Sequence, residues 1–143
     1  MTAASVAYGT NVGLDYSFLT EIDLTGDQFK FVTLGSDGYL DVATAGVLAI
    51  GVTQDSPVGT VAQPLVRQVR YLGPTKVQCG GAFDAGNKLS SDSAGKAVLY
   101  TGATVFTGTP YVVSGSQVLG VALQAGNSGS DTAILFRPSG LSA

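Results

Sequence analysis

Few residues in this chain have side chains that could carry out acid–base, nucleophilic or metal chemistry. The sequence contains no histidine, the residue that most often carries protons near neutral pH. Its single cysteine, Cys79, can neither complete a zinc shell nor form an intrachain disulfide. No activating base can be recognised for Cys79, so we interpret it as a small buried hydrophobic residue rather than a nucleophile.

Two other features resemble catalytic or nucleotide-binding motifs without completing them. Gly95-Lys96 is followed by Ala97, where a phosphate loop requires Ser or Thr, so a hairpin turn is the better interpretation. The single Glu21 and the scattered aspartates offer no recognisable pair of facing acids of the kind that hydrolyses glycosides. We therefore predict that the protein is not an enzyme and has no cofactor.

A group of oxygen-bearing side chains is the nearest approach to a metal site. Asp84 and Asp92 flank one predicted loop with Asn87 between them, and clustered oxygens are the ligands that calcium prefers. The spacing and the closing glutamate of an EF-hand are missing. We therefore interpret these three residues as solvated turn residues and predict no metal site.

The composition favours a protein whose surface is covered by other proteins. A chain of 143 residues suits one domain, and its hydrophobic content of 45% is enough for a core. Charged residues make up only 12%, roughly half of the usual share of about 25%. Seven basic residues and a net charge of −3 leave no basic stripe for nucleic acid. With no spanning apolar run and no signal-peptide pattern, we expect no membrane contact and synthesis in the cytoplasm.

The pattern of turns and apolar residues predicts an all-β fold. Twenty glycines interrupt nearly every stretch long enough for a helix, and Val, Thr, Tyr and Phe dominate between them. Residues 1–13 are small, polar and unpatterned, which indicates a flexible arm. We therefore predict that residues 1–22 comprise an N-terminal arm and the first strand. Further strands are predicted at Phe29–Thr33, Tyr39–Ala43, Val47–Thr53, Leu65–Leu72, Thr75–Cys79, Lys88–Ser90, Lys96–Tyr100, Thr104–Phe106, Tyr111–Val113, Val118–Leu123 and Thr132–Phe136, with an unstructured tail from Arg137 and a flexible end at 138–143.

The two halves of the chain resemble each other, in segments 24–66 and 84–136. Each half has a turn, a hairpin, an apolar strand with a glycine and a glycine-containing loop before another strand, and the second half carries a longer loop at 101–116. Two such units could cover each other's apolar faces. We therefore predict one β domain at 23–137, a small barrel or sandwich of two similar hairpin-containing halves. The matched pairs are Gly26 with Gly86, Asp37 with Asp92, Gly51 with Gly120, and Gly59 with Gly129.

An ordered set of short motifs between Val47 and Phe136 resembles the head decoration, or capsid cement, proteins of tailed bacteriophages. The motifs are Ile50-Gly51-Val52, then Val69-Arg70-Tyr71-Leu72-Gly73 leading into Lys76-Val77-Gln78-Cys79, then Gly81-Ala82-Phe83-Asp84-Ala85-Gly86-Asn87-Lys88-Leu89, then Asp92-Ser93-Ala94-Gly95-Lys96-Ala97, and finally Val118-Leu119-Gly120-Val121-Ala122-Leu123. The resemblance covers about two thirds of the chain. The first 22 residues and the long insertion at 101–116 depart from the family pattern.

The resemblance implies a structural protein on the outer surface of the virion. Members of that family are β-rich, commonly trimeric, and reinforce the shell by binding the major capsid protein. The expected function is therefore capsid stabilisation by a homotrimer that bridges capsid subunits. A glycan-binding β-sandwich adhesin, or a fibre-like protein of the head surface, is the alternative.

Five residues are candidates for the partner interface. Tyr16 and Phe18 would anchor the arm, and Tyr111 belongs to the insertion at 101–116. Arg67 and Arg70 lie on opposite faces of one predicted strand, so at least one of them should be exposed, and arginine is favoured at interfaces.

Overall fold

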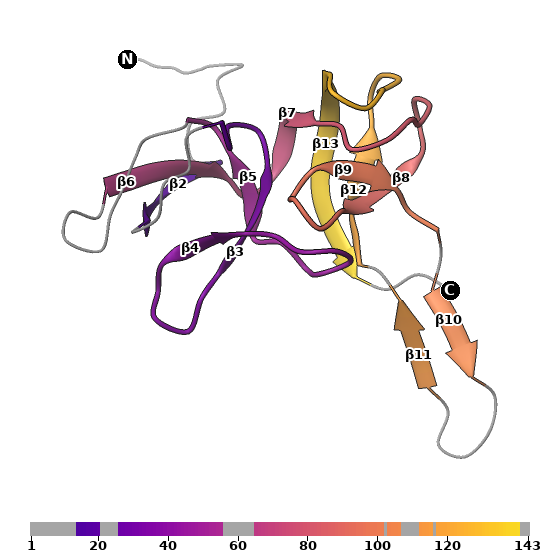
Figure 1. The fold of residues 1–143 in the computed structure, drawn as a ribbon, viewed down its shortest axis with the longest axis horizontal. Helices are drawn as coiled ribbons and strands as arrows, with labels where there is room; N and C mark the ends of the chain where they lie inside the picture. The colour runs from indigo at the N-terminus through magenta and orange to yellow at the C-terminus, as the bar shows by residue number, and fades with distance from the viewer. Residues whose placement is uncertain are drawn as a thin grey trace.

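The computed structural model describes residues 14–20, 26–55, 65–101, 103–106, 112–115 and 117–140. All regular elements in these ranges are β-strands, so the predicted all-β fold is confirmed (Figure 1). Within the same ranges the chain forms no helix that could cross a membrane. The predicted arm at 1–13 and the last three residues of the predicted tail lie outside the described residues.

The strands form two five-stranded antiparallel sheets, which lie side by side in Figure 1, and a separate two-stranded ribbon. The first sheet has the order β2-β6-β5-β3-β4, from strands Asp15–Thr20, Leu65–Arg70, Gly51–Thr53, Phe31–Leu34 and Leu40–Val42. The second sheet has the order β7-β13-β12-β8-β9, from strands Gly73–Gln78, Asp131–Gly140, Val118–Ala122, Lys88–Ser91 and Ala97–Leu99. The ribbon pairs β10, Ala103–Phe106, with β11, Val112–Gly115, as the sequence predicts.

The predicted hairpins are present, but several strand boundaries differ from the prediction. Strand β5 begins only at Gly51, because residues 47–50 lie outside the ladder. Gly73 and Pro74, which the prediction leaves between two strands, begin β7. Strand β7 lies at the edge of its sheet, where a proline leaves no ladder hydrogen bond unmade. Residues 137–140, expected to be unstructured, extend β13, and Gly140 pairs with Val118.

The two sheets have the same topology. In each sheet a hairpin, β3–β4 or β8–β9, pairs with a short glycine-containing strand, β5 or β12. That strand pairs with β6 or β13, which in turn pairs with the edge strand β2 or β7. The structure therefore repeats strand by strand, and the repeat includes β2 and β7, which lie outside the predicted segments 24–66 and 84–136.

Gly51 and Gly120 occupy equivalent places in the two sheets. Gly51 lies opposite Val32 of the hairpin, and Gly120 lies opposite Leu89. A Cβ atom on Gly51 would meet the Arg70 carbonyl oxygen at 2.6 Å, and one on Gly120 would meet the Leu135 carbonyl oxygen at 2.3 Å. Both glycines are required because the neighbouring backbone approaches too closely for any side chain.

Two of the other glycine and aspartate matches shift when the strands are aligned. Asp92 aligns with Gly35, because the two residues make the same backbone hydrogen bonds. Each donates its N–H to the carbonyl oxygen of the residue four positions later, and its own carbonyl oxygen accepts the N–H of the residue three positions later. Asp37 nevertheless has a corresponding role, since its carboxylate accepts the Tyr39 N–H, whereas Asp92 accepts the N–H of Lys96, the residue equivalent to Tyr39. The two turns therefore have the same hydrogen-bonding pattern, but the aspartate that accepts the N–H stands at a different position in each turn.

Gly86 is equivalent to Phe29 rather than to Gly26. Both residues have a positive φ, 61° at Phe29 and 88° at Gly86. Phe29 donates its N–H to the Thr53 carbonyl oxygen, and Gly86 donates to the Ala122 carbonyl oxygen at the same place in the other sheet. Phe29 therefore adopts the left-handed conformation that a glycine adopts in the second half. This conformation is incompatible with a strand, which explains why Phe29 lies outside β3 although the sequence predicts it in that strand.

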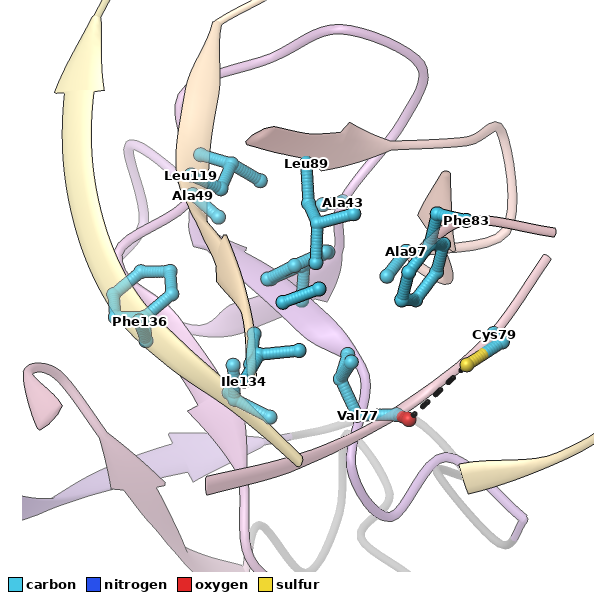
Figure 2. Close-up of a cluster of buried hydrophobic side chains, with 13 residues drawn as sticks. Ala43, Ala49, Val77, Cys79, Phe83, Leu89, Ala97, Leu119, Ile134 and Phe136 are labelled. Atoms are coloured by element: carbon cyan, nitrogen blue, oxygen red, sulfur yellow. Dashed lines mark hydrogen bonds between the residues drawn. The ribbon is translucent and has the colours of Figure 1, made fainter. Parts of the chain in front are cut away.

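Each sheet is partly closed, and the main core lies between the two. Isolated parallel bridges join Leu19 to Tyr39 in the first sheet and Cys79 to Ala97 in the second. The first sheet encloses a small cluster that includes Val32. The larger cluster fills the second sheet (Figure 2). It extends to the first sheet, where Phe31 contributes. Its other members are Ala43, Ala49, Val52, Val77, Cys79, Phe83, Leu89, Ala97, Leu119, Ala122, Ile134 and Phe136.

The close backbone approach at the equivalent glycines predicts that alanine is not tolerated there. Gly51→Ala and Gly120→Ala should each lower the free energy of unfolding by about 2 kcal/mol or more, because rigid backbone has to move. Gly81→Ala is the control, since its Cβ atom would have no neighbour closer than 3.8 Å. Denaturant unfolding measures the difference, and equal stability of all three variants would contradict the explanation.

The backbone of Phe29 predicts an inverted preference between glycine and alanine. Phe29→Gly should be more stable than Phe29→Ala by about 1 kcal/mol, because both lose the ring but only glycine adopts a positive φ without strain. The same pair of changes at Thr33, a strand position in β3, should show the opposite order. If alanine is favoured at both positions in thermal unfolding, the strain at Phe29 is refuted.

Candidate partner-binding surface

Tyr16 and Phe18 lie on one face of strand β2. They are two positions apart, so their side chains project to the same side of the sheet. Their ring centroids lie 5.1 Å apart with the planes tilted by 50°. Tyr16 is 62% exposed, whereas Phe18 also packs against the small cluster inside the first sheet. The structure thus brings together the two aromatic residues that the sequence predicts as interface anchors.

Tyr71 completes this surface, and sequence reasoning missed it. It directly follows β6, and its N–H donates to the carbonyl oxygen of Leu14 at 3.0 Å, which holds it beside the start of β2. Tyr16, Phe18 and Tyr71 line one shallow, mostly apolar hollow, which we call the aromatic patch. Tyr71 could have been found from sequence only if the pairing of β2 with β6, which are far apart along the chain, had been known.

The chemistry of the aromatic patch suits binding. Large exposed apolar surfaces on a protein of low charge mark contacts with other molecules. Tyrosine rings offer apolar area and a hydroxyl group with little loss of side-chain entropy, which makes them frequent at protein interfaces.

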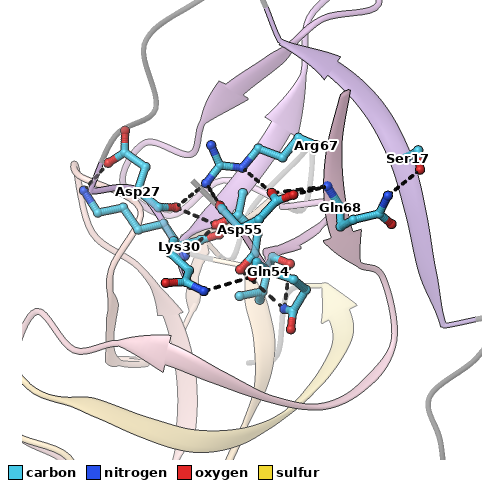
Figure 3. Close-up of polar contacts among 10 residues, drawn as sticks. Ser17, Asp27, Lys30, Gln54, Asp55, Arg67 and Gln68 are labelled. Carbon is cyan, nitrogen blue, oxygen red and sulfur yellow. Dashed lines mark hydrogen bonds and ion pairs between the residues drawn. The ribbon is translucent and has the colours of Figure 1, made fainter. Parts of the chain in front are cut away.

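Arg67, one of the two candidate interface arginines, is completely buried. Its Nη2 donates to the Asp27 carbonyl oxygen at 3.1 Å and to the carbonyl oxygen of Asp55 (Figure 3). Its Nε lies 3.3 Å from the Asp55 carboxylate as an ion pair. Burial lowers the pKa of the Arg67 guanidinium, and the charges of Asp55 and Asp27 oppose that shift. Arg67 therefore joins strand β6 to two loops of the first sheet.

Arg70 is only 9% exposed, so the prediction that at least one of the two arginines is exposed is wrong. Its guanidinium forms a two-point ion pair with Asp15 of β2, and its Nη1 donates to the carbonyl oxygen of Pro74. These bonds connect the first sheet to the edge strand of the second. Alternation placed the two arginines on opposite faces as expected, but neighbouring loops and strands cover both faces of β6.

The remaining candidate residues do not add to the surface. Tyr111 lies outside the described residues. Cys79 is buried, as predicted, and burial raises the pKa of its thiol, although hydrogen bonds to Ser130 and Asn127 oppose the shift. The nucleophilic thiolate of Cys79 is therefore disfavoured.

The oxygen-bearing residues of the second hairpin serve the turns. The Asn87 side-chain oxygen accepts the Asp84 N–H at 2.8 Å. Asp92 Oδ1 accepts the N–H groups of Ala94 and Lys96. Among the described residues, no three acidic, histidine or cysteine side chains gather in a way that could hold a metal ion.

The fold and the patch together define an all-β protein of two topologically repeated sheets with one exposed aromatic surface. No protein-family model and no curated protein matches the chain. A solved structure with a similar fold is the N base of head fiber gp8.5 in bacteriophage phi29, with a TM-score of 0.62 and 15% sequence identity. The similarity covers 90% of this chain and 99% of that one, so it extends over both sheets.

The contacts of Arg67 predict that lysine cannot replace it. Arg67→Lys should lower the free energy of unfolding by about 2 kcal/mol, because an ammonium group cannot reproduce the forked contacts to two carbonyl oxygens and a carboxylate. Arg137→Lys, at an exposed position, is the matched control and should change stability little. Equal effects of the two changes in urea unfolding would show that the buried contacts contribute nothing specific.

Proposed function

We propose that this chain is a structural protein of a bacteriophage head, attached to the outer surface of the capsid through the major capsid protein. The observation that carries the proposal is the similarity of fold to the phi29 head fiber base over nearly the whole length of both chains. The sequence motifs that resemble head decoration proteins support the same location.

Composition and surface chemistry support this role. Charged residues make up 12% of the chain, and the described surface carries the aromatic patch. Such a surface is poorly suited to a free monomer and well suited to a protein that functions in contact with other subunits.

We further propose that the protein reinforces the shell as a homotrimer that bridges capsid subunits. Each contact can be weak, because linked contacts on a fixed lattice raise the effective concentration of the next one. A protein that binds the assembled shell but not the free subunits then stabilises the shell by mass action. The fibre-like alternative is favoured by the phi29 similarity and differs in one measurable respect: attachment of a fibre base needs no reinforcement of the shell.

The experiment compares phage heads that lack this protein with the same heads after the protein has been added back. Co-sedimentation tests attachment, and DNA release during heating or at low salt tests reinforcement. We expect the protein to co-sediment and the decorated heads to retain DNA to a higher temperature. Attachment without protection would replace the reinforcing role with the fibre-like one, and absence of attachment would overturn the proposal.

A truncated chain locates the capsid contact in the same assay. Deletion of residues 1–13, the predicted arm, should weaken co-sedimentation and leave the melting temperature of the isolated protein nearly unchanged, because an arm that docks on the capsid adds nothing to the core. Deletion of residues 141–143 is the control and should leave binding intact. A large loss of thermal stability without residues 1–13 would assign them to the core instead.

A further inference from the structure

The aromatic patch has an equivalent in the second sheet. Strands β2 and β7 hold the same edge position, and the register of their pairing places Tyr16 where the second sheet has Thr75, and Phe18 where it has Val77. Tyr71 follows Arg70 as Phe136 follows Leu135, and these two positions are also equivalent. Each sheet therefore presents the same three positions at the same end.

The equivalent positions in the second sheet are covered by the first sheet. Thr75 is 8% exposed and Val77 and Phe136 are fully buried, whereas Tyr16 is 62% and Tyr71 41% exposed. The rings of Phe31 and Phe136 lie 6.0 Å apart. Beside them, Gln54 Nε2 donates to Thr75 Oγ1 at 2.8 Å. The surface that covers this end of the second sheet is therefore the side of the first sheet that carries Phe31 and Gln54.

The second sheet carries the equivalent of that covering side as well. Gln54 donates its N–H to the Gln68 carbonyl oxygen at 2.9 Å, and Leu123 donates to Ala133 at the same place and distance in the other sheet. Lys88 and Val121 face each other across β8 and β12 as Phe31 and Val52 do across β3 and β5. Leu123 is 48% exposed and Val121 is half-buried. We call the side defined by Val121 and Leu123 the β12 face.

We propose that the aromatic patch of one copy binds the β12 face of a second copy, in the way that the first sheet packs on the second within one chain. The equivalence places Leu123 of one copy against Tyr16 of the other, where the single chain has Gln54 against Thr75. A polar pair in the one contact corresponds to an apolar pair in the other. The same equivalence places Lys88 against Tyr71, where the single chain has Phe31 against Phe136. Burial of two large exposed side chains supplies the driving force, at roughly 25 cal/mol per Å² of apolar area.

This contact joins two different surfaces, so it is a head-to-tail association. Each copy retains one unused surface after a single contact, and the association continues until a ring closes or a filament grows. The inference concerns the isolated chain and does not depend on attachment to a capsid. It therefore stands or falls separately from the proposed attachment to the capsid.

The test is the mass of the purified full-length chain in sedimentation velocity. The wild-type protein should sediment above the 14.4 kDa of one chain. Tyr16→Asp and Leu123→Asp should each abolish the assembly, because each removes one of the two surfaces. Mixing the two variants should restore a 1:1 heterodimer, because the Tyr16→Asp chain keeps its β12 face and the Leu123→Asp chain keeps its aromatic patch. A contact between identical surfaces would not be restored in this way.

Leu48→Asp is the matched control, since it places the same charge at a leucine that is 54% exposed and belongs to neither surface. This variant should assemble like the wild type, and circular dichroism of all variants should show unchanged β structure. A wild type that stays monomeric at about 100 μM, where a contact of micromolar affinity is nearly saturated, would overturn the proposal. So would assembly of the Tyr16→Asp chain or the Leu123→Asp chain alone, or a mixture of the two that stays monomeric.

Discussion

The structure depends on strand β3 being buried on both of its faces. Successive residues Phe31 and Val32 are both fully buried, although they project to opposite sides of the strand. Val32 packs inside the first sheet, and Phe31 reaches across to Phe136 in the main core. One short strand therefore contributes to both clusters and attaches the first sheet to the second. A substitution at either position would disturb a core, since neither side chain has solvent beside it.

Much of the fold could be predicted because glycine-rich turns and alternating residues are local signals. The hairpins β3–β4 and β8–β9 both have such turns. The alignment of the two halves was predicted less well, because it depends on hydrogen bonds between distant strands. Gly26 matches Gly86 by residue type, whereas Phe29 holds the matching conformation. A phenylalanine with positive φ has no signature in a single sequence, since the residue ordinarily avoids that region.

The candidate surface shows the same division between local and distant information. Alternation alone placed Tyr16 and Phe18 together on an exposed side of β2. Alternation also separated Arg67 from Arg70, but exposure did not follow, because the covering groups come from Asp27, Asp55, Asp15 and Pro74, which are distant from the arginines in sequence or in another sheet. A charged residue in a strand is therefore ambiguous from sequence: the same arginine can solubilise a surface or hold loops together from the inside.

A repeated unit that packs on its own neighbour raises a physical problem at the two ends of the repeat. In the middle of the chain, the side of the first sheet that carries Phe31 meets the end of the second sheet, and both surfaces disappear from solvent. At the ends, one surface of each kind is left exposed by the part of the chain that the structure describes. Solenoid proteins solve this problem with polar capping units. This protein lacks such polar capping at the described ends: Tyr16 and Leu123 are exposed there, whereas the equivalent residues Thr75 and Gln54 contact each other between the two sheets. Aromatic and aliphatic side chains at exposed ends weaken solubility, so their presence favours a protein whose ends are meant to be covered.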